Sequence, residues 1–124
     1  MNWSATGAIL LALAVMIGAF GAHGLRERLE SLGTAGTYEK AVFYHFIHAM
    51  GILVVAILAR TGTFPEGSVD WVCTLLLAGI VFFSGSLYVL ALTGNRMLGA
   101  ITPIGGVLFI VGWLLLAWRL RRIL

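Results

Sequence analysis

Four long segments without a charged side chain constrain how this 124-residue chain can fold more than any other feature. These segments cover residues 1–25, 41–59, 71–95 and 97–118. A helix needs about 20 mostly apolar residues to cross the hydrocarbon core of a bilayer, and each segment is close to or above that length. We therefore predict an all-α integral membrane bundle in one domain, with four transmembrane helices at about 4–25, 41–60, 69–92 and 98–118.

The composition indicates a chain surrounded by lipid. Only 10% of the residues are charged, against about 25% in soluble domains, and the mean hydropathy is +1.03. The basic residues behind the net charge of +3 flank the apolar segments as membrane anchors do, and no pattern indicates nucleic-acid binding. The first segment has no Lys or Arg before it and exceeds a signal-peptide core, which favours a retained helix. We expect a multi-pass protein of the inner (plasma) membrane, with the lipid bilayer as its first partner.

The connections between the apolar segments predict local structure of their own. Three leucines lie at spacings i, i+4 and i+7 opposite charged residues, namely Leu25, Leu29 and Leu32. This pattern predicts a short amphipathic helix on the membrane surface, which ends at Gly33. Ser68 is expected to cap the third helix, and Gly94-Asn95 is typical of a tight reversal between the third and fourth helices.

The directions of the four helices place most polar side chains at one end of the bundle. Four spans return the chain to its starting side, so both termini share one membrane face, here called face A, and the opposite side is face B. The end of the first span and the start of the second therefore lie at face B. Polar side chains within a membrane are costly and usually face the bundle interior or a cavity. We predict a polar pocket, or a hydrogen-bond cluster, at face B, lined by His23, Tyr44, His45, His48 and Tyr88.

The histidines leave three interpretations open. They could hydrogen-bond a backbone carbonyl or a tyrosine hydroxyl across helices. They could contact a small ligand, a lipid headgroup or a quinone-like molecule. They could also hold a metal or a haem iron, for which His23, His45 and His48 are the candidate ligands. The sequence does not identify the cofactor.

No recognisable enzyme centre is present, because paired carboxylates, a Ser-His-Asp set and a phosphate-binding glycine loop are all missing from the pattern. We therefore predict a protein without catalytic activity. The first hypothesis is a binding or accessory module that uses the pocket at face B. A less favoured one is an oligomeric transporter or channel, because the half of each span near face A offers few polar residues for a permeation path.

Rows of small residues support the remaining hypothesis, a structural or interaction subunit. On the first helix these rows consist of Ala14, Gly18, Gly21, Ala22 and Gly24, and on the fourth of Gly99, Gly105, Gly106 and Gly112. Small residues let helix backbones approach closely in lipid. The approach could be within the chain, between copies in a homo-oligomer, or toward another membrane protein.

Face A carries an aromatic belt and a basic C-terminus. Trp3, Trp71 and Trp118 fall at this face, as tryptophans of a lipid–water interface do. Lys and Arg residues number four on each face, so their count does not decide the orientation. Arg26 and Arg28, which follow the first helix, favour a cytoplasmic face B, whereas the terminal cluster RLRR, with no acidic residue close by, favours cytoplasmic termini. We expect the termini to be cytoplasmic.

Four motifs, one from each span, resemble a known family. They are GAFGAHGL at 18–25, YEKAVFYHFIHAMGIL at 38–53, FFSGSLYVLALTG at 82–94 and LGAITPIGGVLFIVGW at 98–113. Together they are similar to the "domain of unknown function 423" family of small multi-pass membrane proteins, over nearly the whole chain. The resemblance implies a four-helix inner-membrane protein without an established activity, and it supplies no catalytic or binding residue.

Overall fold

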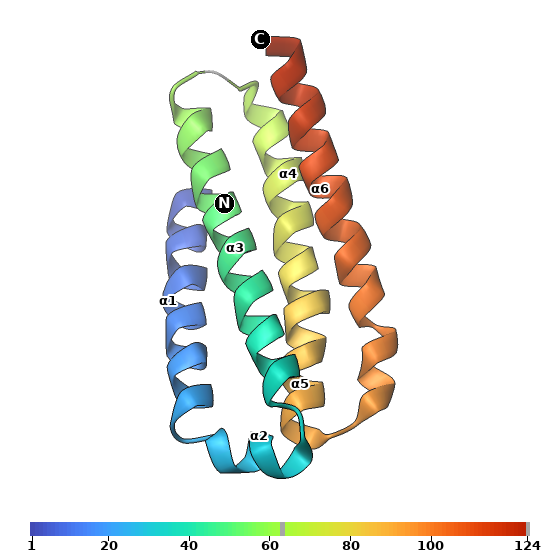
Figure 1. The fold of residues 1–124 in the computed structure, drawn as a ribbon. Helices are drawn as coiled ribbons and strands as arrows, with labels where there is room; N and C mark the ends of the chain where they lie inside the picture. Colours follow the sequence, from blue (N-terminus) through green and yellow to red (C-terminus); the bar gives the residue numbers. More distant parts are fainter. Residues whose placement is uncertain (63, 124) are drawn as a thin grey trace.

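The computed structural model describes residues 1–62 and 64–123, and four of its helical spans are long and apolar enough to cross a membrane. The elements are α1 (Trp3–Ala22), α2 (Arg26–Leu32), α3 (Ala35–Arg60), α4 (Glu66–Gly79), the π-helical η1 (Ile80–Gly85), α5 (Ser86–Thr93), the 3-10 helix η2 (Arg96–Ala100) and α6 (Thr102–Ile123). The third span joins α4, η1 and α5, and the fourth joins η2 and α6. The predicted all-α membrane bundle is therefore confirmed (Figure 1).

The observed helix ends differ from the predicted ones in places where polar residues continue or stop a helix. α3 begins at Ala35, whereas the start predicted from the charge-free segment was residue 41. The charged residues before 41 keep that part of the chain out of the hydrocarbon, but they do not end the helix. α1 ends at Ala22, since the backbone of His23 leaves the helical region. The fourth span begins with a 3-10 turn, and Pro103 follows in the first turn of α6, where its missing donor costs little.

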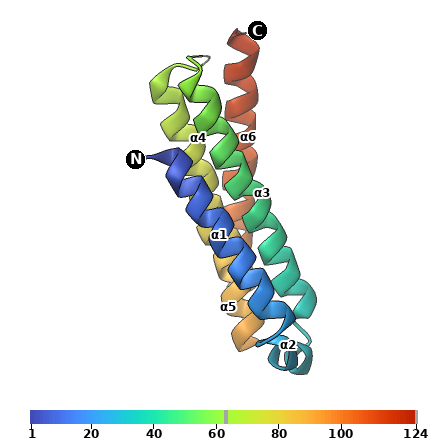
Figure 2. The same ribbon diagram turned by 90° about the vertical axis from the view of Figure 1, so that its left-hand side faces the viewer.

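α3 is the central helix of the bundle. It packs against α1 on one side and against α4, η1 and α5 on the other, while α6 packs on α4 and η1. Figure 2 shows the same order from the side, with α1 nearest the viewer and α6 behind. α1 and α6 are therefore the outer helices, with most of their surface turned toward lipid.

The rows of small residues are used for packing within the chain. A Cβ on Gly7 would lie 2.9 Å from the backbone nitrogen of Leu53 in α3, and Ala14 is 1% exposed. Gly21 faces the ring of Tyr38, and on α6 Gly105 faces the backbone of Phe83 in η1. These close approaches confirm the expected packing role. Gly18, Gly21 and Ala22 are packed less completely, because they also border a groove between α1, α2 and α3.

At face A, a hydrogen bond that no sequence pattern predicts links the first and third spans. The indole nitrogen of Trp3 donates to Oδ1 of Asp70 at 2.6 Å and joins α1 to α4. Trp3 is buried, so its prediction as an interfacial anchor is wrong, whereas Trp71 and Trp118 are exposed as an aromatic belt requires.

The predicted cap of the third span is wrong as well. Pro65 occupies the position before α4, and its ring leaves no donor to satisfy there. Ser68 lies inside the first turn of α4 and is buried. The chain therefore enters the helix three residues earlier than predicted.

At face B, α2 packs on the end of the bundle, where it contacts α1, α3 and α5 (Figure 1). Leu29 is buried beside Tyr38 and Ala91, and Arg28 Nε donates to the carbonyl of Leu92 at 2.7 Å. The helix ends at Gly33 with φ +68°, the left-handed conformation that glycine adopts without strain, as predicted.

Candidate functional site at face B

His45 links the central helix to the third span. It is 3% exposed, and its Nδ1 lies 2.8 Å from the hydroxyl of Tyr88 on α5. Its Nε2 is also buried and forms no hydrogen bond within the described part of the chain. His45 is therefore fixed by one strong contact on one side of its ring.

His48 points toward a different helix. Its Nδ1 lies 2.7 Å from the carbonyl of Tyr44, and because a carbonyl only accepts, Nδ1 carries the hydrogen. The ring stacks on Phe109 of α6 with centroids 3.4 Å apart and planes 11° apart. The ring of Tyr44 is also nearly parallel to that of His48, with the two ring centroids 5.9 Å apart. The two histidines, three residues apart, thus serve two different helix interfaces.

His23 stays apart from both. It lies exposed in the connection between α1 and α2. Within residues 1–62 and 64–123, no three His, Cys, Asp or Glu side chains come together as a metal site would require. The predicted set of three histidines is therefore not assembled in this structure, while the pairs His45–Tyr88 and Tyr44–His48 are.

The polar residues gathered near face B form a buried hydrogen-bond cluster. Ser84 of η1 donates to the carbonyl of Ala41 at 2.8 Å, and Ser86 bonds Thr102 at 2.7 Å. These bonds join α3, the third span and α6 in the half of the bundle where the sequence predicts polar atoms to meet. They match the interpretation in which the polar side chains hydrogen-bond across helices.

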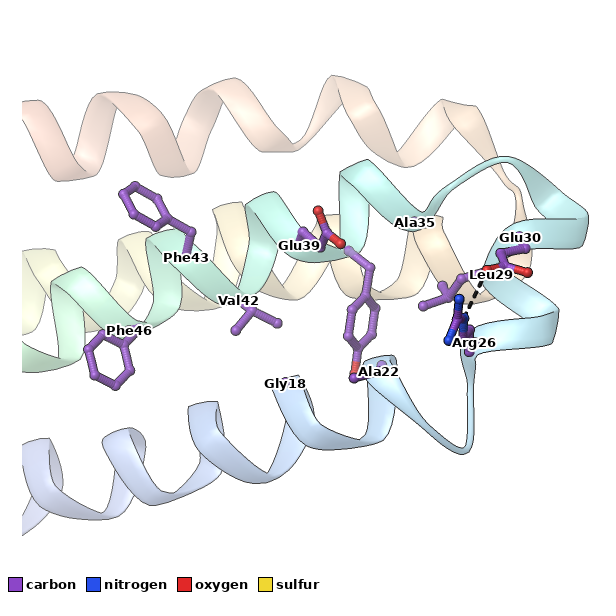
Figure 3. Close-up of a pocket in the computed structure, with 12 residues that line it drawn as sticks. Gly18, Ala22, Arg26, Leu29, Glu30, Ala35, Glu39, Val42, Phe43 and Phe46 are labelled. Atoms are coloured by element: carbon purple, nitrogen blue, oxygen red, sulfur yellow. Dashed lines mark hydrogen bonds and ion pairs between the residues drawn. The ribbon is translucent and has the colours of Figure 1, made fainter.

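A groove of about 630 Å³ lies beside this cluster, between α1, α2 and α3 (Figure 3). Its size falls within the roughly 300–1,000 Å³ of typical small-molecule sites. The lining residues are Gly18, Gly21 and Ala22 of α1, Arg26, Leu29 and Glu30 of α2, and Ala35, Tyr38, Glu39, Val42, Phe43 and Phe46 of α3. The small residues of α1 leave room that larger side chains would fill.

The groove changes in polarity along its length. Arg26, Glu30 and Glu39 lie toward face B, whereas Val42 and Phe46 lie deeper along α3 (Figure 3). From residue 35 to 46 the helix rises about 16 Å, at 1.5 Å per residue. That length is about half of the roughly 30 Å hydrocarbon core, or one leaflet.

None of the residues predicted to bind a ligand lines this groove: His45 and His48 are buried in the bundle, and His23 is exposed between α1 and α2. Tyr38 connects the two regions, because it lines the groove, donates to the carbonyl of Ile17 at 2.5 Å and packs its ring 5.6 Å from that of Tyr88. No sequence pattern predicted that Arg26, Glu30 and Glu39 line one groove. Their signal was a charged connection opposite a glycine-rich helix end, but only the packing of α1 on α3 brings the two together.

Comparison with known proteins finds relatives that are named membrane proteins. The family model described as "Protein of unknown function (DUF423)" matches residues 17–106, which include the whole groove. The UPF0382 membrane protein of Staphylococcus saprophyticus is 54% identical over 110 residues, covering 89% of this chain and 88% of the relative. The UPF0382 membrane protein YwdK of Bacillus subtilis is 48% identical over 110 residues, with the same two coverages. These names state no activity. No solved structure matches the chain.

Proposed function

Since this chain belongs to the DUF423 family of membrane proteins, whose description assigns no activity, we propose a function from the groove at face B. The protein is a non-catalytic binding module of the membrane. It holds one amphiphilic molecule, with an apolar chain and a polar head, between α1, α2 and α3. The binding role is the one predicted from the sequence, but its site is the groove and not the predicted set of histidines and tyrosines.

The polarity of the groove is the observation that supports this function. An amphiphile in a bilayer keeps its head at the interface and its chain in the hydrocarbon. The groove offers charged side chains at face B and apolar ones, such as Val42 and Phe46, at the depth of the chain. The α3 segment that lines the groove, residues 35–46, rises about 16 Å and so extends from the interface into the hydrocarbon of one leaflet.

Filling the groove should remove the bound molecule. We expect Val42→Trp to occupy the space beside Gly18, since a Cβ on Gly18 would already lie 3.3 Å from Val42. Val54→Trp is the matched control, because Val54 is 47% exposed on the same helix and lies outside the groove. Native mass spectrometry of the full chain, released from mild detergent after membrane extraction, measures how much lipid each variant retains.

The parent and Val54→Trp should retain about one amphiphile per chain, and Val42→Trp should lose most of it. Equal retention by Val42→Trp and the parent, or a parent without any retained amphiphile, would contradict the proposed function. Circular dichroism of each variant checks that the helices remain folded.

We also propose that face A, with both termini, is on the cytoplasmic side of the plasma membrane. Arg119, Arg121 and Arg122 lie within the last turns of α6, and the guanidinium groups of Arg119 and Arg122 lie 4.9 and 5.1 Å from the ring of Trp118. A terminal basic cluster of this kind can set the orientation of a small protein under the positive-inside rule.

Cysteine labelling tests this orientation. Cys73 is the chain's single cysteine and is buried, so Cys73→Ala gives a clean background. Met97→Cys, at an exposed position of face B, should react with a membrane-impermeant maleimide in intact spheroplasts. Gly67→Cys, exposed at face A, should react only after lysis. The reverse labelling pattern would show that the termini face outward.

A further inference from the structure

The charges at the mouth of the groove specify the head of the bound molecule, an inference that rests on the proposed function. We infer that the groove selects a zwitterionic phospholipid with a primary ammonium group, such as phosphatidylethanolamine. Arg26 would bind the phosphate, and Glu39 would bind the ammonium. Both residues line the groove at its face B end (Figure 3).

The guanidinium of Arg26 has N–H donors that are available for a ligand. Its Nε donates to Glu30 at 3.0 Å, a contact that orients the guanidinium while leaving both of its Nη groups free of any bond among the described residues. A guanidinium carries five N–H donors in a planar fork, which suits a phosphate. The ion pair with Glu30 therefore orients the guanidinium of Arg26 and leaves its Nη groups available to bind a phosphate.

Glu39 is the complementary acceptor. It lies on α3, one turn from the start of the groove at Ala35, and forms no ion pair or hydrogen bond within the described part of the chain. An ionised carboxylate only accepts hydrogen bonds, so its natural partner is a group that is positively charged and carries N–H donors. A primary ammonium has three such donors.

The same charges disfavour other headgroups. The mouth of the groove holds two carboxylates, Glu30 and Glu39, and one guanidinium, Arg26. A phosphatidylglycerol head brings a negative charge without a positive one and would face an excess of like charge. A phosphatidylcholine head carries its positive charge without an N–H donor and cannot hydrogen-bond Glu39. Selection thus comes from repulsion as well as from attraction.

Competition between lipids with identical acyl chains tests the inference. The full chain is equilibrated in detergent with equal amounts of phosphatidylethanolamine, phosphatidylcholine and phosphatidylglycerol, and bound lipid is identified by native mass spectrometry. We expect phosphatidylethanolamine to be retained roughly threefold or more over each of the others, a size typical of exposed charged contacts. Glu39→Gln should bring the ratio of phosphatidylethanolamine to phosphatidylcholine close to one without reducing total lipid. Glu27→Gln, on α2 outside the groove, is the matched control and should keep the parent's ratio.

The outcomes separate this inference from the function on which it rests. Retained lipid without preference, a preference for phosphatidylglycerol, or a ratio unchanged by Glu39→Gln overturns the headgroup assignment and leaves the groove as a site for an amphiphile. A parent that retains no lipid, or a Val42→Trp variant that retains as much as the parent, overturns the proposed function itself.

Discussion

Gly105→Ala is expected to destabilise the protein, whereas Gly106→Ala, one residue further along, is expected to leave it unchanged or slightly more stable. A Cβ on Gly105 would lie 2.7 Å from Cα of Phe83 and also contact its backbone nitrogen. The backbone of η1 cannot rotate away as a flexible side chain could. Overpacking of this kind costs about 1–3 kcal/mol, and occasionally more.

At Gly106 the same substitution meets no obstacle. The nearest atom, Cδ2 of Phe83, would lie 3.9 Å from the new Cβ, which is an ordinary contact. Alanine favours a helix interior over glycine by about 1 kcal/mol. The two variants therefore differ in the sign of their effect. The free energy of unfolding, followed by circular dichroism during titration with a denaturing detergent, measures it. Equal losses at both positions would mean that α6 does not approach η1 as closely as the structure has it.

Tyr88→Phe is expected to weaken the bundle by removing the partner of His45. The hydroxyl of Tyr88 lies 2.8 Å from Nδ1 of a histidine that is 3% exposed and whose Nε2 has no hydrogen bond among the described residues. Without the Tyr88 hydroxyl, Nδ1 of His45 would be buried without its partner. A buried polar group left unpaired costs about 1–3 kcal/mol, while interhelical bonds in membranes reach about 1.7 kcal/mol. We expect a loss of about 1–2 kcal/mol in the free energy of unfolding.

Tyr44→Phe is the matched control for that measurement. Tyr44 packs its ring 4.4 Å from that of Phe83, and its hydroxyl forms no hydrogen bond within residues 1–62 and 64–123, so phenylalanine keeps its contacts. The double variant His45→Leu/Tyr88→Phe should lose less than the sum of the two single losses, because both members of the pair are then apolar. Additive losses would show that the two side chains stabilise the bundle independently.

The sequence alone predicted which end of the bundle is polar but not which polar side chains meet. Depth follows from helix direction, so His45, His48 and Tyr88 were expected near face B, where they lie. Rotation about the helix axis does not follow from depth. His45 and His48 share a face of α3, yet one ring contacts Tyr88 and the other stacks on Phe109, and His23 contacts neither.

The groove is a second feature whose neighbouring residues could not be predicted from the sequence. Tyr38, Glu39 and Arg26 were visible in the sequence as a tyrosine and two charges of a connection. They line one groove because α3 begins at Ala35 and packs on α1 at positions such as Gly7 and Gly21. The π-helical turn of the third span, which sets Phe83 against Gly105, had no signal in the hydrophobic pattern either.

What the sequence determined by itself is the number of spans, the left-handed end of α2 at Gly33 and the polar character of face B. These are properties of hydrophobic length, local conformation and chain direction, and each can be read along one dimension. What only the tertiary structure decided is the set of neighbours, because contact depends on the rotation and crossing of helices that are set by many small packing interactions at once. The proposed binding site belongs to that second class, since its two walls and its charged mouth come from three helices.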